Sequence, residues 1–196
     1  MVTDAEDGEI TCIIKGVHLH LRTHPRLFSP KSIDRGTLAM LSTVDFHPED
    51  RVLDLGCGYG VVGILAAKIV GPDKVIMLDN DPLATAYARL NAELNGVEAV
   101  KVVQSEGFAA LDEAGFTIIL TNPPYHSDFS TAKHFIERGF NRLKMGGRMC
   151  LVVKRRTWYE NKMRAIFGGV RVEEIDGYFV MTAERRTPQW AKSLRK

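Results

Sequence analysis

The sequence predicts an α/β fold: a Rossmann-like, doubly wound sheet of seven mostly parallel strands, with an antiparallel hairpin at its C-terminal edge. Short apolar runs of strand length alternate with longer segments of helical period. A glycine-rich turn at residues 56–60 follows the first of these strands, and Asp176-Gly177 separates the last two as a hairpin turn. Such alternation is typical of a parallel sheet covered by helices on both faces.

A small β extension is expected before this sheet. Residues 11–21 alternate between apolar and polar side chains around Gly16, which predicts two short strands or a bent hairpin. One face is expected to hold Ile13, Val17, Leu19 and Leu21. A helical period follows, for which Ser32 or Asp34 is a suitable N-cap.

The core strands are expected at residues 51–55, 74–78, 100–104, 117–120, 148–153, 170–175 and 178–183. Helices are expected between them at residues 61–70, 82–94, 131–143 and 158–167. Pro82 suits the first turn of its helix, and Asn95-Gly96 suits the end. Because ligands of such sheets bind outside the carboxyl ends of the strands, residues that directly follow a strand are the candidates for chemistry.

The length of 196 residues fits one domain, with the extension at residues 11–45 and the core at residues 46–196. The longest apolar stretch is too short to span a membrane, and the acidic N-terminus is unlike a secretory signal. Cys12, Cys57 and Cys150 show no paired spacing. They are typical of reduced thiols in a cytoplasmic protein and not of disulfides or a zinc site, so no metal is expected.

Charge is unevenly distributed along the chain. Residues 1–98 carry nine basic and fourteen acidic side chains, a net charge of −5, whereas residues 99–196 carry seventeen and ten, a net charge of +7. A basic half can attract a polyanion such as RNA, or it can be an ordinary solvated surface. Charge alone does not decide between the two.

The turn after the first strand, Asp54-Leu55-Gly56-Cys57-Gly58-Tyr59-Gly60, is expected to bind a ligand. Residues 58–63 match the dinucleotide pattern G-x-G-x-x-G and Asp79 follows, so a nicotinamide cofactor is one candidate. However, Asp54 would place a carboxylate near the pyrophosphate and repel it. S-adenosylmethionine has no phosphate and carries a sulfonium and an ammonium group, which a carboxylate attracts. Residues 52–60 also resemble the first motif of class I methyltransferases.

Acidic residues end the next two strands. The Asp79 carboxylate can accept hydrogen bonds from both ribose hydroxyls of the cofactor, and capping of the following helix suits Asp81 better. By resemblance to the methyltransferases, Glu106 holds the adenine amino group through its side chain or the adjacent backbone N–H, while Phe108 stacks on adenine or belongs to the core. The cofactor-binding candidates are Asp54, Gly56, Cys57, Gly58, Gly60, Asp79, Asn80, Glu106, Gly107, Phe108 and Asn122.

The tetrapeptide Asn122-Pro123-Pro124-Tyr125 follows the fourth strand and is the candidate catalytic element. A rigid turn would explain the prolines but not the flanking residues. In the catalytic interpretation, the Asn122 side-chain oxygen and the Pro123 carbonyl accept hydrogen bonds from an exocyclic amine. This frees its lone pair, otherwise delocalised into the ring, for in-line attack on the methyl group, while Tyr125 stacks on the ring. No strong general base is required, because the methylated nitrogen is more acidic.

Taken together, residues 28–37, the glycine turn and Asn122-Pro123-Pro124-Tyr125-His126 resemble the small-domain methyltransferases, whose bacterial members modify the 2-amino group of guanine in ribosomal RNA. Residues 167–169 and 177–180 are similar to the closing strands of that family. The resemblance implies S-adenosylmethionine as cofactor, ribosomal RNA as substrate, and Phe28 and Gly36 at the entrance for both. It leaves open methylation of adenine, of a protein glutamine or of a small planar amine, and, from a different class, a non-catalytic RNA-binding module.

The sequence departs from that family in two respects. The ribosomal guanine enzymes usually carry an additional N-terminal domain that helps bind RNA, and a Phe after the two prolines where this chain has Tyr125. The chain resembles the free-standing members, so RNA binding is expected from this domain alone or from a homodimer. The substrate-binding candidates are Tyr125, His126, Arg35, Lys154 and Arg155. Further basic candidates are Arg22, Arg26, Lys31, Arg156 and a tail of Arg185, Arg186, Lys192, Arg195 and Lys196, all of which are also compatible with solvated surface charge.

Overall fold

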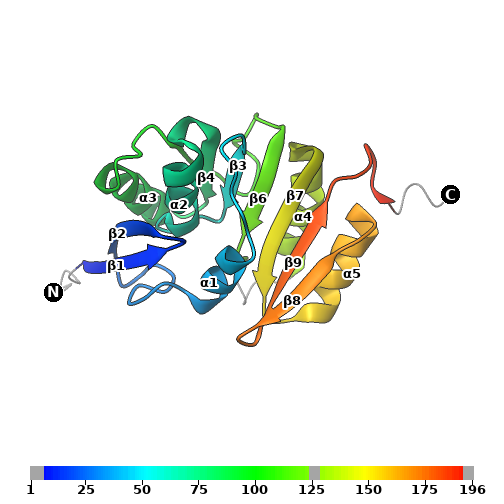
Figure 1. Ribbon diagram of the computed structural model, residues 1–196, viewed down its shortest axis with the longest axis horizontal. Coiled ribbons are helices and arrows are strands. Elements are labelled where there is room, and N and C mark those ends of the chain that lie inside the picture. Colours follow the sequence, from blue (N-terminus) through cyan, green and yellow to red (C-terminus); the bar gives the residue numbers. More distant parts are fainter. Residues whose placement is uncertain (1–6, 124–128, 192–196) are drawn as a thin grey trace.

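The computed structural model describes residues 7–123 and 129–191, and these have the expected α/β fold (Figure 1). The main sheet has seven strands in the order β5-β4-β3-β6-β7-β9-β8. They are β3 (Val52–Leu55), β4 (Val75–Asp79), β5 (Lys101–Gln104), β6 (Phe116–Thr121), β7 (Leu143–Val153), β8 (Arg171–Ile175) and β9 (Tyr178–Glu184). A separate antiparallel hairpin consists of β1 (Gly8–Ile14) and β2 (Val17–Thr23).

Helices cover both faces of the main sheet. One face carries α1 (Arg35–Ser42), α2 (Val61–Val70) and α3 (Pro82–Leu94), and the other carries α4 (Phe129–Arg142) and α5 (Arg156–Phe167). Alternate residues of a strand point to opposite faces, so Val52 and Met77 belong to the core beneath α2 and Leu53 and Leu78 to the core beneath α4. Because both faces are buried, the central strands are apolar almost throughout.

The strand order places a switch point between β3 and β6. The chain runs outward from β3 through β4 to β5 and then returns to β6 on the other side of β3, and all these neighbours are parallel. The edge hairpin is confirmed, and its antiparallel strand is β9, which pairs between β7 and the outermost strand β8. Ligands of doubly wound sheets bind at such a switch point, outside the carboxyl ends of the strands.

The N-terminal hairpin is joined to α3 by side-chain amides. Asn91 accepts a hydrogen bond from the Arg22 N–H at 2.7 Å and donates to the carbonyls of Arg22 at 2.9 Å and Tyr59 at 2.8 Å. Asn95 pairs with the His20 backbone in the same way, at 3.1 and 2.7 Å. These bonds cover the outer edge of β2, and they tie the hairpin to the glycine turn.

Two local expectations need correction. Val17, Leu19 and Leu21 share the inward face of the hairpin as expected, but Ile13 is 62% exposed, since it pairs with His18 on the outward face. The strand expected at residues 148–153 begins already at residue 143, and Gly146 lies within it with a φ of 77°. In the part of the chain that the structure describes, no helix combines the length and the apolarity that a membrane span requires.

Candidate functional site

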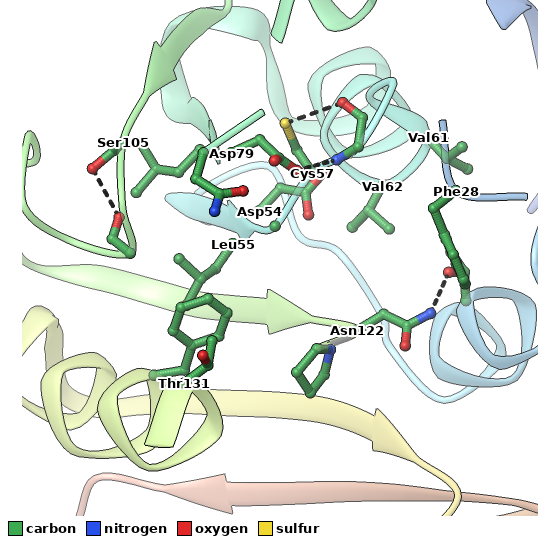
Figure 2. Close-up of a pocket in the computed structure, with 18 of the residues that line it drawn as sticks. Phe28, Asp54, Leu55, Cys57, Val61, Val62, Asp79, Ser105, Asn122 and Thr131 are labelled. Atoms are coloured by element: carbon green, nitrogen blue, oxygen red, sulfur yellow. Dashed lines mark hydrogen bonds between the residues drawn. The ribbon is translucent and has the colours of Figure 1, made fainter. Parts of the chain in front are cut away.

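A cavity of about 790 Å³ opens at the switch point (Figure 2). Its walls come from the carboxyl ends of β3, β4 and β6, the segment that follows β5, the segment before α1 with its first turn, and the first two turns of α4. Asp54, Asp79 and Ser105 lie toward one end, and Asn122 and Phe28 lie toward the other (Figure 2). The volume and the mixed polar and apolar lining suit a small organic ligand.

The glycine turn has the tight backbone that its sequence predicts. Gly56, Gly58 and Gly60 have φ values of 77°, 55° and 100°, a region that L side chains rarely adopt. The backbone N–H groups of Gly56 and Cys57 donate to the Leu78 carbonyl at 2.8 and 2.9 Å, which ties the turn to the end of β4. The positive-φ glycines let the chain turn tightly at the cavity wall, where Cys57 and Tyr59 also line the cavity.

Asp54 lies between the turn and α2. Its side chain is 2% exposed, and its Oδ2 accepts a hydrogen bond from the Gly63 N–H at 2.8 Å, in the first turn of α2. Burial raises the pKa of the Asp54 carboxyl to about 7, with the Gly63 hydrogen bond opposing and the nearby Asp79 charge adding to the rise. Gly63 is required here, because a Cβ at that position would lie 2.3 Å from the Met77 Cγ atom. Asp54 thus supports the helix and also lines the cavity.

Asp79 connects the turn with the start of α3. Its Oδ2 accepts a hydrogen bond from the Gly58 N–H at 2.8 Å, and its Oδ1 accepts one from the Asp81 N–H at 3.0 Å. A carboxylate has about four acceptor positions, so both oxygens can still accept bonds from ligand hydroxyls. Asp81 caps α3 through the Leu83 N–H at 2.8 Å, as its place before Pro82 suggests.

Asn122, directly after β6, has the most specific geometry in the cavity. Its Nδ2 donates hydrogen bonds to the Asp34 Oδ2 at 2.8 Å and to the Thr37 Oγ1 at 3.0 Å. Its Oδ1 is buried and has no hydrogen-bond partner among the described residues. Pro123 lies beside it on the cavity wall. A buried acceptor without a donor costs free energy, so this oxygen marks the place where a ligand N–H or O–H fits.

The structure brings most of the other predicted cofactor residues to the same cavity. Gly56, Cys57, Gly58, Asn80, Glu106, Gly107 and the 56%-exposed Phe28 all line it. Burial raises the pKa of the Cys57 thiol, so Cys57 contributes as a neutral side chain. Glu106 is exposed at the wall.

Several predicted residues lie elsewhere. Phe108 is a core residue, packed edge-on against Phe135 at a centroid distance of 6.4 Å, and it does not line the cavity. Gly36 and Gly60 are buried behind the wall, within α1 and at the start of α2. Pro124, Tyr125 and His126 lie outside the described residues, as do Lys192, Arg195 and Lys196.

The basic candidates divide into two groups. Arg35 and Arg155 are exposed outside the cavity wall, as are Arg26 and Lys31, while the Lys154 ammonium lies 5.1 Å from the centre of the Tyr178 ring. The other described candidates make ion pairs or, like Lys154, a ring contact within the chain: Arg22 with Asp7 and Glu9, Arg156 with Glu160, Arg186 with Glu184, and Arg185 over the Phe140 ring.

An aromatic pair extends the surface formed by Lys154 and Arg155. Phe129, which is 38% exposed at the start of α4, stacks on Trp158 of α5 with a centroid distance of 4.4 Å and an interplanar angle of 21°. Both helices begin at the carboxyl edge of the sheet, the edge on which the cavity opens. We call Phe129, Lys154, Arg155 and Trp158 the aromatic-basic rim.

Sequence reasoning gave no role at the reacting end of the site to Asp34 and Thr37, the two residues that hold the Asn122 amide. Asp34 was expected only to cap α1, a role it performs by accepting the Thr37 N–H at 2.8 Å. Both residues also belong to the segment of family resemblance, in which neither was given a role of its own. An Asp at the N-cap is common at helix starts. Nothing in that local pattern indicates that both side chains reach a strand end 88 and 85 residues away.

Comparison with known proteins is consistent with this geometry. The family model described as "Methyltransferase small domain" matches residues 18–183. "Ribosomal RNA small subunit methyltransferase C" of Pseudomonas syringae pv. tomato is 32% identical over 187 residues, covering 93% of this chain and 53% of that protein. The protein of the same name from Pseudomonas putida GB-1 is 32% identical over 164 residues, covering 81% and 49%. The chain therefore spans about half the length of these curated relatives.

Among solved structures, a T. thermophilus 16S rRNA N2 methyltransferase in complex with AdoMet and guanosine superposes with a TM-score of 0.82 and 28% identity. That match covers 92% of this chain and 51% of the other. A methyltransferase from Pyrococcus furiosus gives a TM-score of 0.71 at 19% identity, covering 86% of this chain and 90% of the other, which shows the shared fold alone.

Proposed function

Because the chain belongs to the methyltransferase small domain family, we propose that it transfers the methyl group of S-adenosylmethionine to the 2-amino group of guanine in ribosomal RNA. The observation that carries the proposal is the Asn122 Oδ1, a buried acceptor without a partner among the described residues, at the carboxyl end of β6. An exocyclic amine supplies the missing donor. The names of the relatives and the guanosine in the T. thermophilus complex support guanine as the base.

The glycine-turn end of the cavity fits S-adenosylmethionine better than a dinucleotide. Two carboxylates, Asp54 and Asp79, line it together with Glu106, and these would repel a pyrophosphate and attract the ammonium and sulfonium groups. We propose that Asp79 accepts the ribose hydroxyls and that Glu106 or the Gly107 N–H meets the adenine. When bound, the cofactor supplies an electrophilic methyl group.

The residues at the other end prepare the amine. We propose that Asn122 Oδ1 and the Pro123 carbonyl each accept a hydrogen bond from one N–H group of the amine. Together they hold the amine nitrogen in line with the methyl group. The new N–C bond forms as the S–C bond breaks, which leaves a neutral thioether and a cationic nitrogen. That nitrogen then releases one proton to solvent. The negative ends of the two carbonyl dipoles stabilise the developing positive charge, so catalysis here is positioning and electrostatics.

Recognition of RNA is assigned to the aromatic-basic rim. The exposed Phe129 and the half-buried Trp158 offer a stacking surface for a neighbouring base, and Lys154 and Arg155 lie next to it for the phosphates. Tyr125 and His126 are proposed to contact the target base. The cytoplasmic location stays a prediction, and so does a homodimer that enlarges this surface. Sedimentation of the protein with and without RNA tests whether the homodimer forms.

The deciding experiment maps methylated bases in ribosomal RNA from cells with and without the gene, with Asn122→Ala as the complementing control. We expect one 2-methylguanine to disappear with the gene, to return with the wild-type chain and to stay absent with the variant. An unchanged ribosomal RNA profile would refute the substrate. Calorimetry with S-adenosylhomocysteine and with NAD tests the cofactor separately, and tight binding of NAD alone would refute the methyltransferase assignment.

A further inference from the structure

We infer that Asp34 and Thr37 are positioning residues, which hold the Asn122 carboxamide so that its oxygen, and not its nitrogen, faces the reacting group. We call this pair with Asn122 the amide clamp. The inference rests on the proposed function, which it deepens by naming what selects an N–H-bearing substrate. It assigns a role in the reaction to the start of α1, which lies 88 and 85 residues before Asn122 in the sequence.

The orientation of the amide follows from its neighbours. Asn122 Nδ2 lies 2.8 Å from the Asp34 Oδ2 and 3.0 Å from the Thr37 Oγ1. If the amide were rotated by 180°, its oxygen would lie at hydrogen-bond distance from a carboxylate oxygen, and two acceptors would repel each other. The hydroxyl of Thr37 could serve either orientation. Asp34 therefore decides the orientation, and Thr37 fills the second N–H of the amide.

As a consequence, only a hydrogen-bond donor of the substrate can bind at the Asn122 oxygen. Both N–H bonds of Asn122 are used within the clamp, and the remaining Oδ1 can only accept. An amino group fits there, whereas a ring carbonyl or an unprotonated ring nitrogen would leave two acceptors face to face. The clamp thus selects amines over carbonyl-bearing edges of the same base.

The charge of Asp34 adds to this geometry. A carboxylate that accepts from Nδ2 polarises the amide and makes its oxygen a stronger acceptor, as in other chains of hydrogen bonds. The negative charge also lies on the side of Asn122 opposite to the nitrogen that becomes cationic during transfer. Asp34 itself is held in place because the same Oδ2 accepts the Thr37 N–H at 2.8 Å and caps α1.

Matched substitutions separate the clamp from the cap. Asp34→Ser keeps an N-cap of similar strength but shortens the side chain so that it no longer bridges to Asn122. Asp34→Asn keeps an oxygen for both bonds and removes only the charge. Thr37→Val removes the hydroxyl at nearly constant volume, and Thr37→Ser restores it. We expect kcat to fall about 10- to 100-fold in Asp34→Ser and about 3- to 10-fold in Thr37→Val. The kcat of Asp34→Asn should lie between those of Asp34→Ser and the wild type, and the kcat of Thr37→Ser should stay within about 2-fold of the wild-type value.

A double-mutant cycle distinguishes positioning from general structure. In an Asn122→Ala background, Asp34→Ser and Thr37→Val should cost no further kcat, and the KM for S-adenosylmethionine should stay unchanged in all variants. If the wild-type kcat is kept in Asp34→Ser, or if the loss persists in the Asn122→Ala background, the inference is overturned.

A second readout does not depend on turnover. In the unliganded protein, the Asn122 side-chain NH₂ signals, assigned by their loss in Asn122→Ala, should be protected from solvent exchange and should lose that protection in Asp34→Ser. Unprotected signals in the wild type would overturn the clamp even if the enzyme is active. Protected signals in a protein that methylates no amine would instead reject the proposed function and keep the clamp.

Discussion

The two ends of the cavity are built in different ways. At the glycine-turn end, Gly58, Asp79 and Asp81 are joined by hydrogen bonds between strand ends that are neighbours in the sheet. At the amine end, Asn122 depends on Asp34 and Thr37, which come from a helix outside the sheet. The first end is defined mainly by backbone and carboxylates, the second by one side chain whose orientation comes from a distant element.

This difference predicts that substitutions at the two ends impair different properties of the protein. Changes at the glycine-turn end should weaken cofactor binding and alter stability, because the same carboxylates support α2 and α3. Changes at the amine end should lower turnover and leave the cofactor bound, because the Asn122 oxygen has no structural partner among the described residues. The following variants test this separation, from the largest expected effect to the smallest.

Asn122→Ala should have the largest effect. Removing the acceptor should lower kcat about 10²- to 10³-fold, since one preorganised dipole at a reacting centre contributes on that scale. Calorimetry should give a dissociation constant for S-adenosylhomocysteine within about 2-fold of the wild type. If cofactor affinity fell as much as kcat, the two ends would not be independent.

Asp54→Asn should change the pH dependence of stability. The folded-state pKa of Asp54 is about 7, raised by burial above the 3.8 of an unperturbed carboxyl. The folded state therefore holds the proton more tightly than the unfolded state. The contribution of Asp54 to the free energy of unfolding is fully present below about pH 4 and is lost as the pH rises through 7. Between pH 5 and pH 8 this loss is about 3 kcal/mol in the unliganded wild type and should be absent in the variant.

Urea unfolding at several pH values measures the effect. Because the cofactor's ammonium favours the charged carboxylate, S-adenosylhomocysteine should flatten the pH dependence of the wild type but not that of Asp54→Asn. Equal slopes for the two proteins without ligand would show that Asp54 is not the group that titrates.

Asp79→Asn should weaken cofactor binding moderately. The amide cannot accept from both backbone N–H groups and from ribose hydroxyls, so we expect the dissociation constant for S-adenosylhomocysteine to rise about 10- to 100-fold. Asp81→Asn is the matched control, because Asn is an equally good N-cap. An equal loss in the two variants would indicate a general disturbance of α3 and not a lost ligand contact.

Arg155→Glu should have the smallest effect. It reverses one exposed charge on the aromatic-basic rim and should raise the KM for RNA about 3- to 10-fold, with a weaker dependence of binding on salt. Arg171→Glu reverses a charge that is paired with Glu173, at the amino ends of the parallel strands and away from the cavity, and should leave RNA binding unchanged. Equal effects in both variants would show that net charge and not the rim attracts RNA.

Much of the fold could be predicted because its signals are local. The bounds expected for α2 and α3 agree with the structure, since an N-terminal turn and a following Gly or Asn-Gly enclose each apolar period. Phe108 could not be placed, because its sequence neighbours are compatible with a ring in the cavity or in the core. The prediction for Ile13 was wrong. Val17, Leu19 and Leu21 alternate regularly on one face of β2, but only the pairing of β1 with β2 shows which residues of β1 share that face.

The sequence by itself determined the parts of the site that consecutive residues build: the positive-φ glycines, the carboxylates at the strand ends, and the position of Asn122 after β6. Those features need only a strand, a turn and the rule that parallel strands end on one edge. Only the tertiary structure decided the orientation of the Asn122 amide. That orientation depends on a carboxylate 88 residues away, and contacts at such separation arise from the packing of α1 on the sheet and not from any local preference.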